Sequence, residues 1–159
     1  MRPPRLPGRL RALDAFVPEE AGTIADVGAG HGALSVHLAR QMSTVIATEA
    51  KPGPFAELQR NLRAWDAAGV VDARLGLDLE PLNPGEADVV VVAGIGARTA
   101  IRICSQAAAK AVRWIVLQCV QDCDEVEPWL AGCGWRVVRR DDIVERGHTY
   151  PTWLVEVHS

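Results

Sequence analysis

Apolar residues occur along this chain in short unbroken runs that are separated by segments of mixed polarity. The most continuous run covers 88–96, where successive valines leave no alternation of apolar and polar positions. Such a run is typical of a strand that is buried on both faces of a parallel sheet. Shorter runs predict further strands at 23–27, 44–49, 70–75, 114–118, 135–138 and 152–157.

Segments with apolar residues at helical spacing lie between these runs. The first predicts an N-terminal cap helix at about 5–17, which would bury Leu10 and Leu13 and leave its arginines outside. Others predict helices over 34–39, over 55–65, through Ile101 and Ile103, and over 122–130, where Pro128 is expected to disturb the helix.

Strands that alternate with helices predict an α/β fold. We expect an open, mostly parallel sheet with helices on both faces and an antiparallel last strand. Residues 1–159 are expected to form a single domain, because a chain of this length can bury one independent core.

A run of glycines follows the first predicted strand, and the segment reads Asp26-Val27-Gly28-Ala29-Gly30-His31-Gly32. Glycines permit positive φ and let backbone N–H groups approach a ligand closely. Two interpretations fit this loop. Its spacing matches the dinucleotide fingerprint, with Ala33 as the third small residue. An acid followed by three alternate glycines also matches the first motif of Rossmann-like methyltransferases, which bind S-adenosylmethionine.

Asp26 favours the second interpretation. A carboxylate next to the loop would repel the pyrophosphate of a dinucleotide, whereas the methionine ammonium and the sulfonium of S-adenosylmethionine are cations. A purely turn-capping role for Asp26 is the structural alternative. A nicotinamide-dependent oxidoreductase is therefore disfavoured, and tight binding of NADH would revive it.

Three further loops, which follow the second, third and fourth predicted strands, are expected to face the same crevice. Glu49 ends the second strand, where Rossmann-like folds place a carboxylate on the ribose hydroxyls. Asp78 follows the third strand and could accept the adenine amino group, although a turn-forming aspartate fits nearly as well. We predict a cofactor site formed by Asp26, Gly28, Ala29, Gly30, Glu49, Ala50, Leu77, Asp78, Ala93 and Gly94.

His31 and Asp26 are the ionisable pair of the glycine loop and are the candidate catalytic residues. A nearby imidazole or carboxylate can stabilise a developing cation or accept a proton. His31 also fits the plainer role of a hydrogen-bonding loop residue.

The formal net charge is −3, so the chain has no overall basic field that would attract a nucleic acid. Any RNA contact needs a local patch, for which the candidates are Arg2, Arg5, Arg9, Arg11, Arg98 and Arg102. No apolar run is long enough to span a membrane and the N-terminus resembles no signal peptide, so we expect a cytoplasmic protein without a membrane partner. The four cysteines form no C-x-x-C pair, so no metal site is expected. The oligomeric state is not indicated.

Several motifs recur in a characteristic order over essentially the whole chain: Arg9-Leu10, 25–28 followed by His31, Glu49 with Gly53-Pro54, Ala93-Gly94-Ile95-Gly96, Gln118 and Tyr150. With this combination the chain resembles the bacterial tRNA (adenine-22-N1)-methyltransferases, which have a Rossmann-like class I fold and depend on S-adenosylmethionine. The resemblance implies methyl transfer to N1 of an adenine in tRNA.

The chain departs from that family at several positions. Cys119 and Val120 follow Gln118 where the family has Pro-Asn, and the family's C-terminal helical extension has no counterpart before Ser159. We therefore expect cofactor binding and methylation of tRNA to come apart, with a donor affinity ordinary for the fold but weak, salt-sensitive binding of RNA. The alternatives are a methyltransferase for another nucleic-acid position or a small molecule, and a cofactor-binding module without catalysis.

Overall fold

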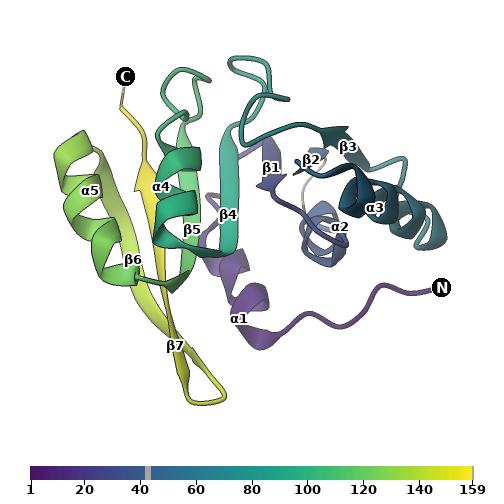
Figure 1. The fold of residues 1–159 in the computed structure, drawn as a ribbon, viewed down its shortest axis with the longest axis horizontal. Helices are drawn as coiled ribbons and strands as arrows, with labels where there is room; N and C mark the ends of the chain where they lie inside the picture. Colours follow the sequence, from purple (N-terminus) through teal and green to yellow (C-terminus); the bar gives the residue numbers. More distant parts are fainter. Residues whose placement is uncertain (42–43, 159) are drawn as a thin grey trace.

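The computed structural model describes residues 1–41 and 44–158. Its strands are β1 (Thr23–Val27), β2 (Thr44–Glu49), β3 (Val71–Leu75), β4 (Val89–Gly96), β5 (Trp114–Gln121), β6 (Arg136–Glu145) and β7 (His148–Glu156). The helical segments are α1 (Gly8–Arg11), η1 (Ala12–Phe16), α2 (Ala33–Ala39), α3 (Pro52–Ala64), α4 (Ala97–Cys104), η2 (Cys123–Glu125) and α5 (Val126–Cys133). All the strands belong to one seven-stranded sheet in the order β3-β2-β1-β4-β5-β7-β6 (Figure 1).

The sheet is parallel except at β7. Strands β1 to β5 pair in parallel with one another, whereas β7 pairs antiparallel with both β5 and β6. The predicted α/β fold with an antiparallel last strand is thus confirmed. The chain builds outward from β1 to β3 and then returns to place β4 on the other side of β1, so the crevice between β1 and β4 lies at the topological switch point.

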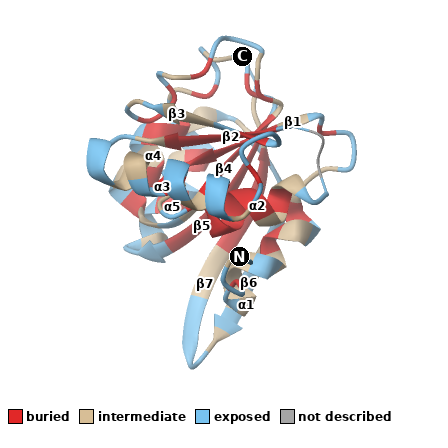
Figure 2. Cartoon of the chain, turned by 90° about the vertical axis from the view of Figure 1, so that its right-hand side faces the viewer, coloured by how far each residue is buried: buried red, intermediate tan, exposed pale blue. Residues whose placement is uncertain are grey.

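Alternate valines of β4 enter two separate hydrophobic cores. Val90 and Val92 pack on the side of α4 and α5, whereas Val89 and Val91 pack on the side of α2 and α3. All four side chains are fully buried, and buried residues follow the strands through the middle of the molecule (Figure 2). The prediction that this strand is covered on both faces is confirmed, and it explains why its sequence does not alternate.

The N-terminal cap helix is shorter than the predicted 5–17. Helical residues run from Gly8 to Phe16, first as one α-helical turn and then as a 3-10 helix. Pro7 has an extended conformation, with φ −54° and ψ 148°. Because a proline also disfavours helical geometry in the residue before it, the segment ahead of Gly8 stays extended.

The C-terminal hairpin is longer than the sequence indicates. Strand β6 continues to Glu145 and β7 begins at His148, and the turn between them has positive φ at Arg146 and Gly147. Such a two-residue turn matches the twist of a hairpin. The expectation that Pro128 disturbs its helix is wrong. Pro128 lies in the first turn of α5, where a backbone N–H would have no partner within the helix, so the proline costs no hydrogen bond.

No described helix combines the length and the apolar character that a membrane span requires.

Candidate functional site

The glycine loop connects the end of β1 to α2 at the switch point. Gly28 and Gly30 have φ of +72° and +58°, and Ala29 N–H donates to the carbonyl of Thr48 in the neighbouring strand. A Cβ atom at either glycine would meet nothing within 4 Å. These two glycines therefore provide backbone geometry and leave open space beside the loop, as a bound ligand requires.

Gly32 has a different role, because it packs against α3. A Cβ atom there would lie 2.6 Å from Leu58 Cδ1, and the φ of Gly32 is +97°. Leu58 is fully buried, so it can move away from such a Cβ only by repacking the core around it.

We predict that Gly32→Ala lowers the free energy of unfolding by about 2–4 kcal/mol, the combined scale of overpacking and left-handed strain. Urea denaturation measures this effect. Gly69→Ala is the matched control, because its Cβ would meet nothing within 4 Å and its φ is not positive. Equal stability of the two variants would contradict the packing role of Gly32.

Asp26 lies buried near the end of β1, at 3% exposure. Its Oδ2 accepts a hydrogen bond of 2.6 Å from Ser35 Oγ of α2. Burial raises the pKa of the Asp26 carboxyl to about 6, opposed by the Ser35 hydrogen bond and assisted by the charge of Glu49. An acid that burial makes costly to ionise becomes easier to ionise when a cation binds beside it.

Glu49 ends β2 and faces the same loop. Its Oε2 accepts a hydrogen bond from Gly30 N–H at 3.3 Å. The register places Glu49 opposite Leu75 of β3, and both Leu75 and Leu77, two residues further on, are exposed apolar side chains. Ala50 is exposed in the turn that follows. The second strand therefore offers an acid beside an open apolar surface.

A cavity of about 310 Å³ opens beside the glycine loop, and we call it the loop cavity. The carboxyl ends of β1 and β4 contribute Asp26, Gly28, Ala29, Ala93 and Gly94 to its wall. The segment 4–10, which precedes and begins α1, forms the opposite wall. The structure thus brings together the predicted residues of the first and fourth strands, with Gly30 and Glu49 next to them.

His31 also lines the loop cavity, but it makes local contacts. Its Nδ1 accepts a hydrogen bond from Ala33 N–H at 3.3 Å, at the start of α2. Its backbone carbonyl accepts from Asn61 Nδ2 of α3 at 2.9 Å. The imidazole therefore caps the first turn of α2, and its Nε2 remains the ring nitrogen available to a ligand.

The Asp78 carboxylate already accepts hydrogen bonds from two side chains. Both carboxylate oxygens bind the Arg102 guanidinium at 2.9 Å, and Oδ2 also accepts from Gln106 Nε2 at 3.0 Å. These hydrogen bonds, chiefly from Arg102, hold the pKa of Asp78 below its usual range. The buried carboxylate thus fixes the loop after β3 to α4, and the charge of Arg102 is compensated.

The six predicted arginines do not form one patch. Arg2, Arg5, Arg9 and Arg11 all belong to the N-terminal segment and line adjoining cavities there. Arg98 lies instead beside Asp122 and Glu125 at the start of α4. Arg102 is paired with Asp78, as described above.

Arg9 links the N-terminal segment to the end of the sheet, which residue patterns did not reveal. Its Nη1 donates to Gln118 Oε1 at 3.0 Å, and Gln118 Nε2 donates to the Arg9 carbonyl at 2.8 Å. The guanidinium also lies over the Tyr150 ring, 5.0 Å from its centroid. Only the recurrence of Arg9, Gln118 and Tyr150 in the family motifs indicated this cluster.

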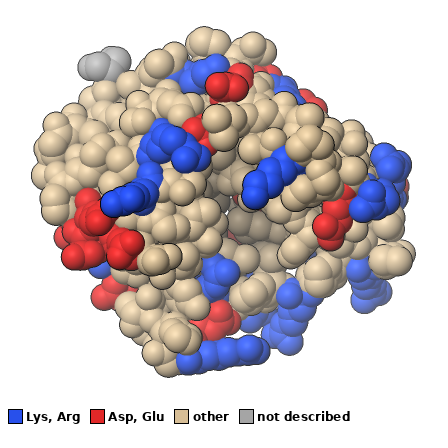
Figure 3. All heavy atoms as spheres, viewed as in Figure 1, with Lys and Arg blue, Asp and Glu red and all other residues tan. Residues whose placement is uncertain are grey.

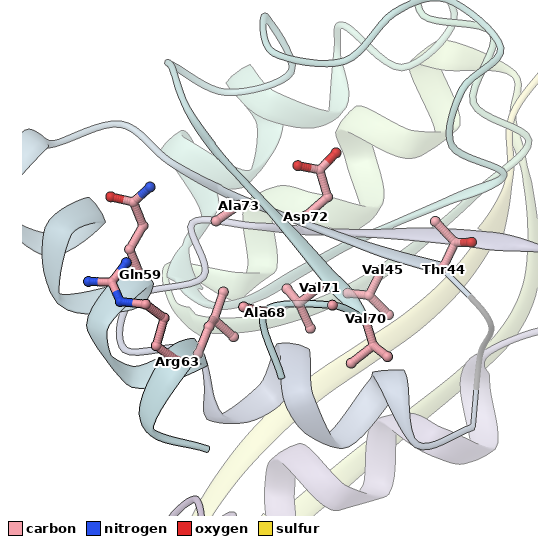
Figure 4. Close-up of a pocket in the computed structure, with 11 residues that line it drawn as sticks. Thr44, Val45, Gln59, Arg63, Ala68, Val70, Val71, Asp72 and Ala73 are labelled. Atoms are coloured by element: carbon pink, nitrogen blue, oxygen red, sulfur yellow. The ribbon is translucent and has the colours of Figure 1, made fainter. Parts of the chain in front are cut away.

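A different cavity, of about 500 Å³, lies at the amino-terminal ends of β2 and β3 (Figure 4). Thr44, Val45 and Val71 line it together with Gln59 and Arg63 of α3. None of the predicted site residues contributes to its described lining, so it is separate from the loop cavity.

All four cysteines are free, and the described residues contain no group of His, Cys, Asp and Glu side chains that could hold a metal ion.

The strand order with an antiparallel β7, together with a glycine loop and a buried acid at the end of β1, defines a Rossmann-like fold of the class I methyltransferase type. Comparison with protein families supports this assignment. Residues 6–152 match the family described as "Methyltransferase domain", and the chain belongs to that family.

The resemblance seen in the sequence is confirmed by individual relatives. The chain is 32% identical over 94 residues to the tRNA (adenine(22)-N(1))-methyltransferase of Bacillus subtilis (strain 168), a match that covers 58% of this chain and 39% of that protein. This chain therefore aligns with about two fifths of the curated relative.

Two solved structures have a closely similar fold. The B. subtilis M1A22 tRNA methyltransferase TrmK superposes with a TM-score of 0.86 and 25% identity, over 97% of this chain and 67% of that one. A Streptococcus pneumoniae protein, solved in complex with S-adenosyl-L-methionine, superposes with a TM-score of 0.87 and 27% identity, over 96% of this chain and 73% of that one.

Proposed function

We propose that this chain binds S-adenosyl-L-methionine at the glycine loop and transfers its methyl group to N1 of an adenine in tRNA. The observation that carries the first part is the buried Asp26 carboxylate, which lines a cavity beside an open glycine loop. The names of the relatives support the second part.

The site residues divide between the two halves of the donor. Asp26 binds the methionine ammonium, and Glu49 accepts hydrogen bonds from the ribose hydroxyls. Ala50 and Leu77 flank the adenine, while the backbone of Gly28, Ala29 and Gly30 lies against the donor. Ala93 and Gly94 close the opposite side.

The donor supplies an electrophilic methyl group, which adenine N1 takes as the sulfur leaves with the bonding electron pair. The chain contributes mainly by positioning the two reactants, since the leaving group needs no further activation. Methylation at N1 generates a cation on the base. The Asp26 carboxylate and His31 Nε2 are the ionisable groups of the loop cavity that can stabilise this cation or accept a proton from the exocyclic amine.

A methyl-transfer assay tests the proposal. Unmodified tRNA is incubated with donor that carries a radiolabelled methyl group, at low and at physiological salt, and the digested nucleosides are separated. We expect the label in 1-methyladenosine, with a rate that falls as salt rises. Label in another nucleoside would indicate a different acceptor position. If the chain binds the donor but transfers no methyl group, it is a cofactor-binding module without catalysis.

A further inference from the structure

A cavity of about 560 Å³ adjoins the loop cavity. It lies between the N-terminal segment and the tip of the β6–β7 hairpin, and we call it the basic cavity. Its charged side chains are Arg5, Arg9, Arg11, Arg146 and Glu145. It shares Arg5 and Arg9 with the loop cavity, so the same two side chains border both spaces.

The arginines of the basic cavity outnumber its acid by four to one. Its four arginines form no ion pair within 4.0 Å among the described residues, whereas Arg74, Arg102 and Arg140 elsewhere bind carboxylates. Its one acid, Glu145, accepts from the backbone N–H groups of Gly8 at 2.7 Å and Arg9 at 3.4 Å. Basic side chains also gather below the hollow on the face shown in Figure 3. Four guanidinium groups against one carboxylate give the cavity a net positive charge, which favours binding of an anion.

The cavity is fixed to the end of the sheet. Arg9 binds Gln118 of β5 and stacks on Tyr150 of β7, as described above. Its Nη1 also lies 3.5 Å from the position of a Cβ at Gly94, at the end of β4. The basic cavity is therefore held beside the part of the loop cavity that Gly94 lines.

We propose that the basic cavity binds a phosphodiester of the RNA strand next to the nucleotide whose base is methylated. This inference rests on the proposed function. Guanidinium groups bind phosphate oxygens in pairs, and phosphate contacts fix the register of a nucleic acid without reading its sequence. The cavity would thereby set the distance between the target adenine and the donor.

The test uses Arg11 and Arg146, because they line the basic cavity and not the loop cavity. The variant is Arg11→Gln with Arg146→Asn, since asparagine tolerates the positive φ of residue 146. The control is Arg60→Gln with Arg63→Gln. Both arginines are exposed on α3, and replacing them removes the same amount of positive charge. Equal thermal midpoints of the three proteins establish that the variants are folded.

Binding of an unmodified tRNA transcript is followed by fluorescence anisotropy over a range of salt. We expect the Arg11/Arg146 variant to bind about tenfold or more weakly and its salt slope to fall by about one to two, with the control within about twofold of the wild type. Calorimetry with S-adenosyl-L-methionine should give unchanged donor affinity in both variants.

Two results overturn the inference. Unchanged tRNA affinity and slope in the Arg11/Arg146 variant would show that no phosphate contact is made there. A parallel loss of donor affinity would show that the cavity holds the donor carboxylate instead. Failure of the proposed function would give a different result. The wild-type protein would then bind tRNA through these arginines but transfer no methyl group, so the phosphate site would stand and the methyl-transfer reaction would not.

Discussion

Asp26→Asn is expected to stabilise the free protein and to abolish most donor binding. At pH 7 the folded chain must hold a buried carboxylate whose pKa is raised to about 6. A raised pKa means that the folded state binds the proton more tightly than the unfolded state, so ionisation of Asp26 lowers stability as pH rises through about 4 to 6. The neutral amide removes this penalty, and the free energy of unfolding should increase by about 1–3 kcal/mol at pH 7.

Urea denaturation at two pH values checks the origin of this gain. The difference between Asp26→Asn and the wild type should be largest at pH 7 and should shrink as pH falls through about 6 to 4, because Asp26 of the folded chain is then protonated. Donor affinity should fall at least about tenfold, the scale of a hydrogen bond to a charged group. A variant that is less stable than the wild type at pH 7 would show that the carboxylate is structurally required.

The same pKa predicts a pH dependence of donor binding in the wild type. Below about pH 6 a proton competes with the donor ammonium for Asp26, so affinity should fall by about tenfold per pH unit. Calorimetry between pH 5 and 8 measures this profile. Asp26→Asn is the control, because its residual affinity should lack the inflection.

Glu49→Ala is expected to weaken donor binding by about 1.5–3 kcal/mol, because two ribose hydroxyls lose a charged acceptor. Glu49→Gln should bind with intermediate affinity, since the amide keeps one acceptor oxygen. Removal of Glu49 also removes a charge that raises the pKa of Asp26, so the pH inflection of donor binding should move lower. Calorimetry that finds an unchanged dissociation constant for Glu49→Ala would exclude Glu49 from the donor site.

The parts of the fold that sequence predicts well are those in which the core dictates the pattern. Both faces of β4 must be apolar because a hydrophobic core packs on each of them. The resulting run of valines makes the strand easy to predict from the sequence. β6 was predicted as a short strand because it is an edge strand with charged side chains on both faces, such as the adjacent Arg139 and Arg140. Charges on an edge strand prevent it from pairing with other chains. They also hide the alternation of apolar and polar residues from which a strand is predicted.

The candidate site divides in a similar way. The glycine loop and Glu49 could be predicted, because local backbone needs and a fixed place at a strand end determine them. Contacts between distant segments could not. The pairing of Asp78 with Arg102 and the hydrogen bonds between Arg9 and Gln118 join residues 24 and 109 positions apart. Nothing in the local pattern of either partner specifies the other.

The central claim is that the crevice above β1, β2 and β4 is the methyl-donor site, and a crystal structure with bound S-adenosyl-L-homocysteine tests it most directly. The account predicts the ribose hydroxyls within hydrogen-bond distance of the Glu49 carboxylate. The methionine ammonium should lie next to Asp26, and the adenine should lie beside Leu77. Density for the ligand at another cavity, or in this crevice with its amino group away from Asp26, would contradict the account.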